Sequence, residues 1–201
     1  MFVQILQDWT RDFLANLKPQ DLPDSSYLAG GTAIALQLGH RRSVDLDFFV
    51  PKEFNEDAWQ QSLEESFQFK LMQKDKQTLT GTVKKVKLSL LGYKYKLLEK
   101  PESCFNLQMA ALPDLAAMKL DTVIKRGAKR DFIDIYFLAQ QYGLKELFIF
   151  HDRKFGEGRE IMVKKALVYF DDADKDYMPD MLVPTDWKEI KNWFVKQIKN
   201  L

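Results

Sequence analysis

The sequence predicts an α/β fold of the α+β type, in which a small mixed sheet is followed by a C-terminal helical bundle. Apolar residues that alternate with polar ones, the pattern of half-buried strands, are concentrated before residue 105. After Pro101 the apolar residues recur every three to four positions, which is the pattern of amphipathic helices. We therefore expect two domains, residues 1–105 around the sheet and residues 106–201 made of helices.

The individual elements follow from the same two periodicities. An amphipathic helix is expected to begin the chain and to end before Pro19. A short strand at Tyr27–Ala29, a helix of one to two turns and a second strand that includes Asp45–Phe48 come next. A helix is then expected at residues 54–67, and strands at residues 67–72, 79–83, 86–91 and 93–98. Further helices are expected at residues 113–126, 129–142, 144–154, 159–170 and 185–200.

The composition is that of a folded protein without an overall affinity for nucleic acid. The 201 residues are 46% apolar and 13% aromatic, which is enough to form a buried core. The 30 Lys and Arg residues nearly balance the 29 Asp and Glu residues, so any contact with nucleic acid must come from a local patch. No apolar run reaches the length of a membrane span, the N-terminus lacks the features of a signal peptide, and Cys104 is the single cysteine. These observations predict a soluble cytoplasmic protein that does not enter a membrane.

Two aspartates in the second strand form the first candidate site. Side chains on a strand alternate between its faces, so Asp45 and Asp47 point the same way and Leu46 points the other. Their Cα atoms would be about 6.5 Å apart. Two neighbouring carboxylates repel each other unless a cation lies between them, and ligands that are all oxygen favour Mg²⁺ or Mn²⁺. We therefore predict a metal site at Asp45 and Asp47.

A glycine turn precedes these aspartates. Gly30, Gly31 and Thr32 lie between the first strand and the helix that follows it. Glycine leaves backbone N–H groups accessible and a helix N-terminus attracts anions, so the turn is suited to bind a phosphate. Arg42 and Ser43, which come just before the aspartates, are further candidate nucleotide-binding residues. The combination predicts nucleotide chemistry with an NTP, and the alternative is a plain glycine turn beside a solvated acidic strand.

A second candidate cluster lies in the helical half. Asp131 and Asp134 are one helical turn apart, and the apolar neighbours of Asp134 indicate that it lies near the core boundary. An ionised carboxylate at such a place needs a cation or hydrogen-bond donors. Lys119, on the preceding helix, and Arg130 are the candidate sources of positive charge. From the residues alone, an ion-pair network that joins two helices and a catalytic cluster are both open.

These motifs resemble those of a known family. The turn at residues 30–32, followed after twelve residues by Asp-x-Asp, is similar to the signature of the DNA polymerase β-like nucleotidyltransferase superfamily. The longer string GGTAIALQLGHRRSVDLDFF resembles, more narrowly, the AbiEii/AbiGii toxin family of minimal nucleotidyltransferases. The resemblance implies that residues 1–105 form a nucleotidyltransferase core.

The same resemblance extends into the helical half and implies a function. Lys119 matches a conserved lysine of the family, and Arg130, Asp131 and Asp134 match its later acidic segment. The implied reaction transfers a nucleotide from an NTP to an acceptor, which we expect to be RNA, and the implied partner is an antitoxin protein. The expected catalytic residues are Asp45, Asp47, Lys119, Asp131 and Asp134. The expected nucleotide-binding residues are Gly30, Gly31, Thr32, Arg42, Ser43, Lys119 and Arg130.

One position departs from the pattern of the superfamily. Active members carry a third carboxylate on a later strand, and Ser89 stands at about that position. No Asp or Glu occurs between Asp75 and Glu99, and a serine hydroxyl is a weaker metal ligand than a carboxylate. Either Asp131 or Asp134 supplies the missing acid, or the chain is a catalytically degenerate module that binds a nucleotide or a partner protein without transfer.

Five lysines in the first half are candidates for contact with an RNA backbone. The five form a basic strand pair, in which Lys85 and Lys87 lie on one face and Lys94 and Lys96 lie on a single face of the other arm. The remaining one is Lys84. Lysines that keep an exposed sheet edge from aggregating explain the pattern equally well. The cleft between the two halves is the expected active site.

Overall fold

The computed structural model describes residues 1–201, which form two compact units. The sheet unit comprises residues 6–33 and 43–111, and the helical unit comprises residues 1–5, 34–42 and 112–201. Helix α2 (Gly30–Leu38) contributes residues to both units. The domain boundary expected at residue 105 would separate two parts that fold independently. The two compact units do not test independent folding, so this boundary stays a prediction.

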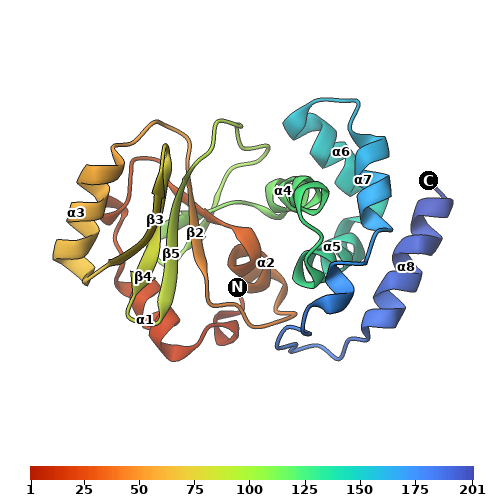
Figure 1. Cartoon of the computed structure of the whole chain (residues 1–201), viewed down its shortest axis with the longest axis horizontal. Helices are drawn as coiled ribbons and strands as arrows, with labels where there is room; N and C mark the ends of the chain where they lie inside the picture. The colour runs from red at the N-terminus through yellow and green to blue at the C-terminus, as the bar shows by residue number, and fades with distance from the viewer. The chain divides into compact units, whose positions relative to one another are not determined.

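The sheet unit contains a seven-stranded mixed sheet with the strand order β3-β4-β5-β2-β1-β7-β6. Figure 1 labels β2, β3, β4 and β5 of this sheet. Its strands are β1 (Tyr27–Ala29), β2 (Leu46–Val50), β3 (Lys70–Asp75), β4 (Thr78–Val83), β5 (Val86–Gly92), β6 (Glu102–Cys104) and β7 (Leu107–Met109). Strands β2 and β5 are parallel, as are β1 and β7, and the other neighbours are antiparallel. The predicted mixed sheet is therefore confirmed. It is extended by β6 and β7, which are too short to show a periodicity in the sequence.

Strand β2 shows the predicted alternation. Leu46, Phe48 and Val50 are buried, whereas Asp47 and Phe49 are half-buried and share the other face. Buried residues of β5 lie beside those of β2 in parallel register. Each large apolar side chain buried in this way contributes about 1.5–3 kcal/mol to the free energy of unfolding. One face of these central strands therefore forms the core of the sheet unit, and the other face presents Asp47.

Helices α1 (Asp8–Asn16) and α3 (Glu56–Phe67) also belong to the sheet unit, and α3 packs on β3 and β4. Asn55 caps α3 by accepting a hydrogen bond from the N–H of Ala58 at 2.9 Å. Gln68 ends the helix in the left-handed conformation. The predicted first helix is shorter than its apolar pattern, because the chain begins with the 3-10 helix η1 (Val3–Ile5) and forms a second, η2 (Pro19–Asp21), after α1.

The strand predicted at residues 93–98 is wrong, because this segment has no regular secondary structure. Tyr93 donates its N–H to the carbonyl oxygen of Val50 at 2.8 Å, which extends the pairing of β5 with β2 by a single bond. Strand β2 ends there, and the next residue is Pro51, which has no N–H for a ladder. Residues 94–98 therefore have no neighbouring strand to pair with, and they do not form a strand.

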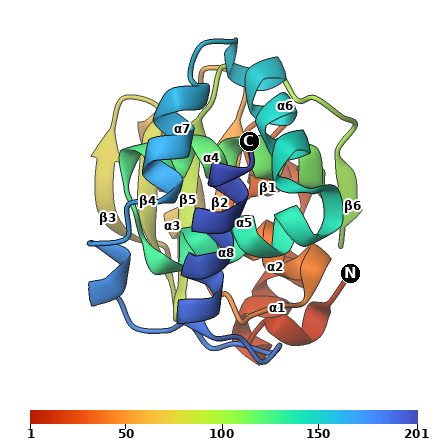
Figure 2. The same ribbon diagram turned by 90° about the vertical axis from the view of Figure 1, so that its right-hand side faces the viewer.

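The helical unit contains the five helices predicted after Pro101, each within three residues of its predicted ends. They are α4 (Leu112–Lys125), α5 (Lys129–Tyr142), α6 (Leu144–Phe155), α7 (Glu160–Leu167) and α8 (Trp187–Lys199), with the 3-10 helix η3 (Ala173–Lys175) before α8. Helix α8 packs along α5 and α7 (Figure 2). Phe132 of α5 is wholly buried there, with ring centroids 5.2 Å from Phe170 and 5.8 Å from both Trp187 and Phe194. None of the helices is long and apolar enough to cross a membrane.

Candidate functional site

Gly30 of the glycine turn lies close to Asp47, the second residue of the acidic pair formed by Asp45 and Asp47. Gly30 begins α2 with a φ of +70°, a backbone conformation that favours glycine. A Cβ atom on Gly30 would lie 2.7 Å from Oδ2 of Asp47. Glycine is therefore the residue that fits at this position, and the carboxylate of Asp47 lies beside the first turn of α2.

The third residue of the turn holds the segment that leads into β2. Thr32 is buried, and its hydroxyl donates a hydrogen bond to the carbonyl oxygen of Asp45. The same hydroxyl oxygen lies 2.7 Å from Oγ of Ser43, which must be the donor because the Thr32 proton is already used. Thr32 thus fixes the position of Asp45 relative to the glycine turn.

Two carboxylates make up the acidic part of this site. Asp45 directly precedes β2, and Asp47 pairs with Ser89 of β5 in parallel register. The position at which the resemblance implies a third carboxylate is therefore filled by a buried hydroxyl beside Asp47. No group of three or more His, Cys, Asp or Glu side chains is arranged to hold a metal ion. A cation bound by Asp45 and Asp47 would need further ligands from a substrate or from water.

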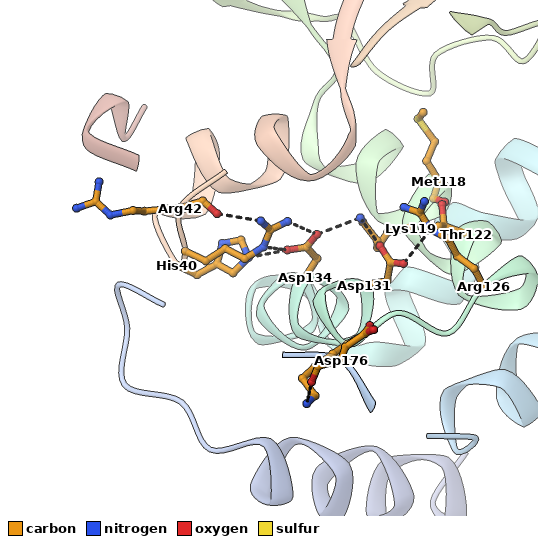
Figure 3. A network of polar contacts seen from close by, with 11 residues as sticks. His40, Arg42, Met118, Lys119, Thr122, Arg126, Asp131, Asp134 and Asp176 are labelled. Carbon is orange, nitrogen blue, oxygen red and sulfur yellow. Dashed lines mark hydrogen bonds and ion pairs between the residues drawn. The ribbon is translucent and has the colours of Figure 1, made fainter. Parts of the chain in front are cut away.

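A network of buried ion pairs lies in the helical unit, around Asp134 of α5 (Figure 3). Its Oδ1 atom accepts hydrogen bonds from Nε2 of His40 and from Nε of Arg41, both at 2.8 Å. Its Oδ2 atom accepts a hydrogen bond from Nη2 of Arg41 at 2.9 Å and lies 3.0 Å from Nζ of Lys119. Asp134 and His40 are wholly buried, so water does not compete for these contacts.

Lys119 of α4 joins Asp134 to a second aspartate. Its Nζ atom lies 2.9 Å from Oδ1 of Asp131, and the lysine is only 6% exposed. The other oxygen of Asp131 lies 3.3 Å from Nε of Arg126, whose side chain is 58% exposed. Three of the predicted site residues are thus linked through Lys119, and Arg126 connects them to the surface.

The cations around Asp134 decide its charge. Burial alone would raise the pKa of this carboxyl group, because it removes water from the ionised form. The charges of Arg41 and Lys119, with the hydrogen bonds from His40 and Arg41, outweigh burial and hold the pKa of Asp134 well below its usual range. Asp134 is therefore ionised at neutral pH. The contacts form the ion-pair network that the sequence allowed, whereas a catalytic role for the same residues stays a prediction.

Arg41 is the main partner of Asp134, and sequence reasoning did not identify it. His40, Arg41 and Arg42 form one basic run, in which no periodicity indicates the side chain that turns inward. In the structure His40 and Arg41 are buried, whereas Arg42 is exposed and its Nε atom lies 3.1 Å from Oδ2 of Asp180. The one available signal was the apolar neighbourhood of Asp134, which requires a cation from elsewhere in the chain.

The predicted nucleotide-binding residue Arg130 lies on the surface. It lines a hollow of about 410 Å³ together with Ala128, Tyr177 and Met178. An anion in solution can therefore reach the guanidinium group of Arg130, whereas the ammonium group of Lys119 is covered.

The sheet unit combines a glycine turn with an acidic strand of a mixed sheet, and helices follow it in the chain. This arrangement is that of nucleotidyltransferase-fold proteins. The chain is similar to JHP933 from Helicobacter pylori, with a TM-score of 0.60, 17% identity, and coverage of 97% of this chain and 92% of that one. It is also similar to MenT4, a nucleotidyltransferase toxin from Mycobacterium tuberculosis H37Rv, with a TM-score of 0.58, 17% identity, and coverage of 96% and 83%. These likenesses show the nucleotidyltransferase fold.

The family follows from similarity in sequence. The model of the nucleotidyl transferase AbiEii toxin family, type IV toxin–antitoxin system, matches residues 12–98 and 94–197, and the chain belongs to this family. The protein aq_aa25 from Aquifex aeolicus (strain VF5) is 32% identical over 195 residues, which cover 94% of each chain. The family expected from the string at residues 30–49 is therefore confirmed.

Proposed function

We propose that this chain is a metal-dependent nucleotidyltransferase that transfers a nucleotide from an NTP to an RNA acceptor in the cytoplasm. The observation that best supports the proposal is the close approach of the Asp47 carboxylate to Gly30, where a Cβ atom would lie 2.7 Å from Oδ2. It sets the anion-attracting N-terminus of α2 beside a carboxylate that can hold a cation. A triphosphate with its bound cation needs both features at one place.

The first turn of α2 would bind the triphosphate. The first N–H groups of a helix have no acceptor within the helix, and Gly30 and Gly31 would present theirs without a side chain in the way. Thr32 would hold the turn in place through its bond to the carbonyl of Asp45. Ser43 is half-buried and donates its hydroxyl proton to Thr32, so it would help to hold the turn in place, and it would have to give up that bond to donate to a phosphate.

Asp45 and Asp47 would hold Mg²⁺ or Mn²⁺. Both are half-buried and so reachable from solvent, and carboxylate oxygens suit these hard cations. Because there are two carboxylates, phosphate oxygens of the NTP would complete the ligand set, which is how proteins usually bind Mg²⁺. When bound, the ion would offset negative charge on the transferred phosphate and on the leaving pyrophosphate. The work of the protein would then be to position the NTP and the acceptor hydroxyl.

Three cations would contribute to nucleotide binding from the helical unit. Arg130 is exposed and can be reached by a phosphate, whereas Arg42, also exposed, would first exchange its ion pair with Asp180. Lys119 would offset triphosphate charge, and to do so it would exchange one of its contacts to Asp131 or Asp134.

The two aspartates of the network would have different roles. Asp134 has both oxygens engaged by Arg41 and Lys119, which favours a positioning role for it. Asp131 contacts the mostly exposed Arg126 through its second oxygen. Asp131 is also wholly buried and both its oxygens are engaged, but Arg126 is mostly exposed and could move away to free one of them. We therefore assign Asp131, rather than Asp134, to orient the acceptor hydroxyl and accept its proton once Arg126 has moved.

The proposal is tested by transfer of label to RNA. The purified protein is incubated with each of the four NTPs, labelled at the α-phosphate, with Mg²⁺ or Mn²⁺ and total cellular RNA. We expect label in RNA for at least one NTP, and its loss with EDTA and in Asp45→Asn. Absence of transfer for every NTP and metal would overturn the proposal.

Ser89 favours a second candidate function, in which the same fold binds a nucleotide or an antitoxin without transfer. A hydroxyl at this register beside Asp47 leaves the site one carboxylate short of the superfamily pattern. The description of the family as part of a type IV toxin–antitoxin system supports an antitoxin as partner. NTP binding by calorimetry without transfer, and no gain in transfer in Ser89→Asp, would favour this candidate.

A further inference from the structure

A ladder of aromatic rings lies on the sheet face that presents Asp47. It consists of Tyr27, Phe49, Tyr93 and Tyr95, which we call the aromatic ladder. Tyr27 of β1 pairs with Phe49 of β2, and their rings stack with centroids 6.1 Å apart. Phe49 meets Tyr93 edge to face at 4.9 Å, and Tyr93 meets Tyr95 at 5.3 Å. The rings thus form one continuous series within the sheet unit.

The aromatic ladder begins beside the acidic pair. Phe49 follows Asp47 by two positions in β2, so both point to the same face with Cα atoms about 6.5 Å apart. The hydrogen bond from Tyr93 N–H to the carbonyl of Val50 holds the chain of Tyr93 against the end of β2. Phe49, Tyr93 and Tyr95 are half-buried, so each ring is fixed by its neighbours and still reaches solvent. A flat ligand on these rings would lie next to the proposed site of transfer.

Lysines alternate with the outer rings. Lys94 and Lys96 are exposed and flank Tyr95, and Nζ of Lys94 lies 5.6 Å from the centroid of that ring. Residues 93–100 contain three lysines and a single acidic residue, Glu99, although the whole chain is nearly neutral. Rings that stack on bases, interleaved with cations that contact phosphates, are the elements by which proteins bind single-stranded nucleic acid. A partner protein would not need this alternation.

We propose that the aromatic ladder binds the single-stranded end of the RNA acceptor, with bases stacked on Tyr93 and Tyr95 and phosphates on Lys94 and Lys96. The acceptor must be unpaired at this point, because bases within a duplex do not expose their faces to a side chain. The inference rests on the proposed function for the identity of the acceptor. Binding itself requires neither an NTP nor a metal ion.

The test is fluorescence anisotropy of a labelled single-stranded RNA of about 12 nucleotides, with EDTA and without NTP. Tyr95→Leu should weaken binding about 10-fold, because it removes one stacked base. Tyr95→Phe, which keeps the ring, should bind within about twofold of the unchanged protein. Tyr169→Leu is the matched control, since Tyr169 is 55% exposed and lies in the helical unit. Circular dichroism melting verifies that each variant is folded.

The role of Lys94 and Lys96 is tested separately, by the salt dependence of RNA affinity. Lys94→Ala combined with Lys96→Ala should reduce the slope of log affinity against log salt by about 1.4, at about 0.7 for each phosphate contact on a single strand. Lys188→Ala combined with Lys199→Ala, two exposed lysines of α8, should leave the slope unchanged.

The outcomes separate this inference from the proposed function. Equal RNA affinity in folded Tyr95→Leu, an unchanged salt slope in the lysine pair, or equal affinity for a blunt duplex would overturn the inference, even if label transfer is observed. Ladder-dependent binding without label transfer would uphold the inference and remove the proposed function. Should the same variants lose capture of an antitoxin while keeping RNA affinity, the ladder would be a protein-binding surface and the inference would be wrong.

Discussion

A Cβ atom on Gly30 would collide with the carboxylate of Asp47, at 2.7 Å from Oδ2. This contact joins the start of α2 to β2, two elements that are adjacent in the sheet unit through the antiparallel pairing of β1 with β2. The positive φ favours glycine at that point, and a β-carbon there would push the carboxylate of Asp47 aside. The first prediction uses both the strained conformation and this displacement of Asp47.

Gly30→Ala should weaken NTP binding and should cost about 1–2 kcal/mol of unfolding free energy, because a β-carbon strains the positive φ and displaces Asp47. Gly143→Ala is the matched control, since Gly143 has a φ of +80° and open space around its Cβ position. Both variants should lose comparable stability in urea, and only Gly30→Ala should lose NTP affinity in calorimetry. Equal NTP affinity in the two variants would place the nucleotide elsewhere.

Replacing both aspartates of the acidic pair should separate binding from stability. In Asp45→Ala combined with Asp47→Ala, metal-dependent NTP binding should disappear, while circular dichroism should show that the protein remains folded. Asp171→Ala combined with Asp172→Ala, in an exposed loop, serves as the control for loss of two charges. If titration calorimetry finds NTP affinity unchanged in the first pair, the metal assignment is wrong.

Lys119→Ala should destabilise the protein by about 3–5 kcal/mol, because it leaves the buried Asp131 and Asp134 without a shared cation. Lys125→Ala removes an exposed lysine on the same helix that pairs with Asp121, and it should cost less than about 1 kcal/mol. Urea unfolding of both variants measures the difference. Similar unfolding free energies would show that the network contributes little to the fold. NTP affinity per folded molecule of Lys119→Ala then reports separately on the proposed role in nucleotide binding.

Asp134 should give the protein a stability that depends on pH. Its pKa is held well below the usual value near 3.8, so its contribution to stability is present above that value and is lost as the pH falls below it. Asp134→Asn should therefore be strongly destabilised at pH 7, and its deficit relative to the unchanged protein should shrink below about pH 4. Urea unfolding at a series of pH values measures this deficit. A deficit that stays constant down to pH 3 would contradict the ionised network.

The sequence predicted those features that repeat along a short stretch of chain. The alternation of β2 placed Asp47 opposite the core, and the helical period placed Lys119, Asp131 and Asp134 where contacts between α4 and α5 could form. The place of Ser89 was implied by the resemblance to the superfamily, which expects a carboxylate at about that position, and in the structure Ser89 pairs with Asp47.

Features that depend on distant partners were not predicted. Arg41 reaches Asp134 from 93 positions away, and nothing in the basic run marks it as buried. The segment at residues 93–98 has a strand-like composition, but no strand lies beside it after β2 ends. Periodicity describes how one segment could be buried, whereas the choice of partner is made by the whole fold.

The most direct test of the central claim compares label transfer from NTP to RNA by the unchanged protein, Asp47→Asn and Ser89→Asp under identical metal and substrate conditions. We expect slow transfer by the unchanged protein, none by Asp47→Asn, and faster transfer by Ser89→Asp, because a carboxylate at that register would add a metal ligand beside Asp47. Transfer by Asp47→Asn at the unchanged rate would contradict the account.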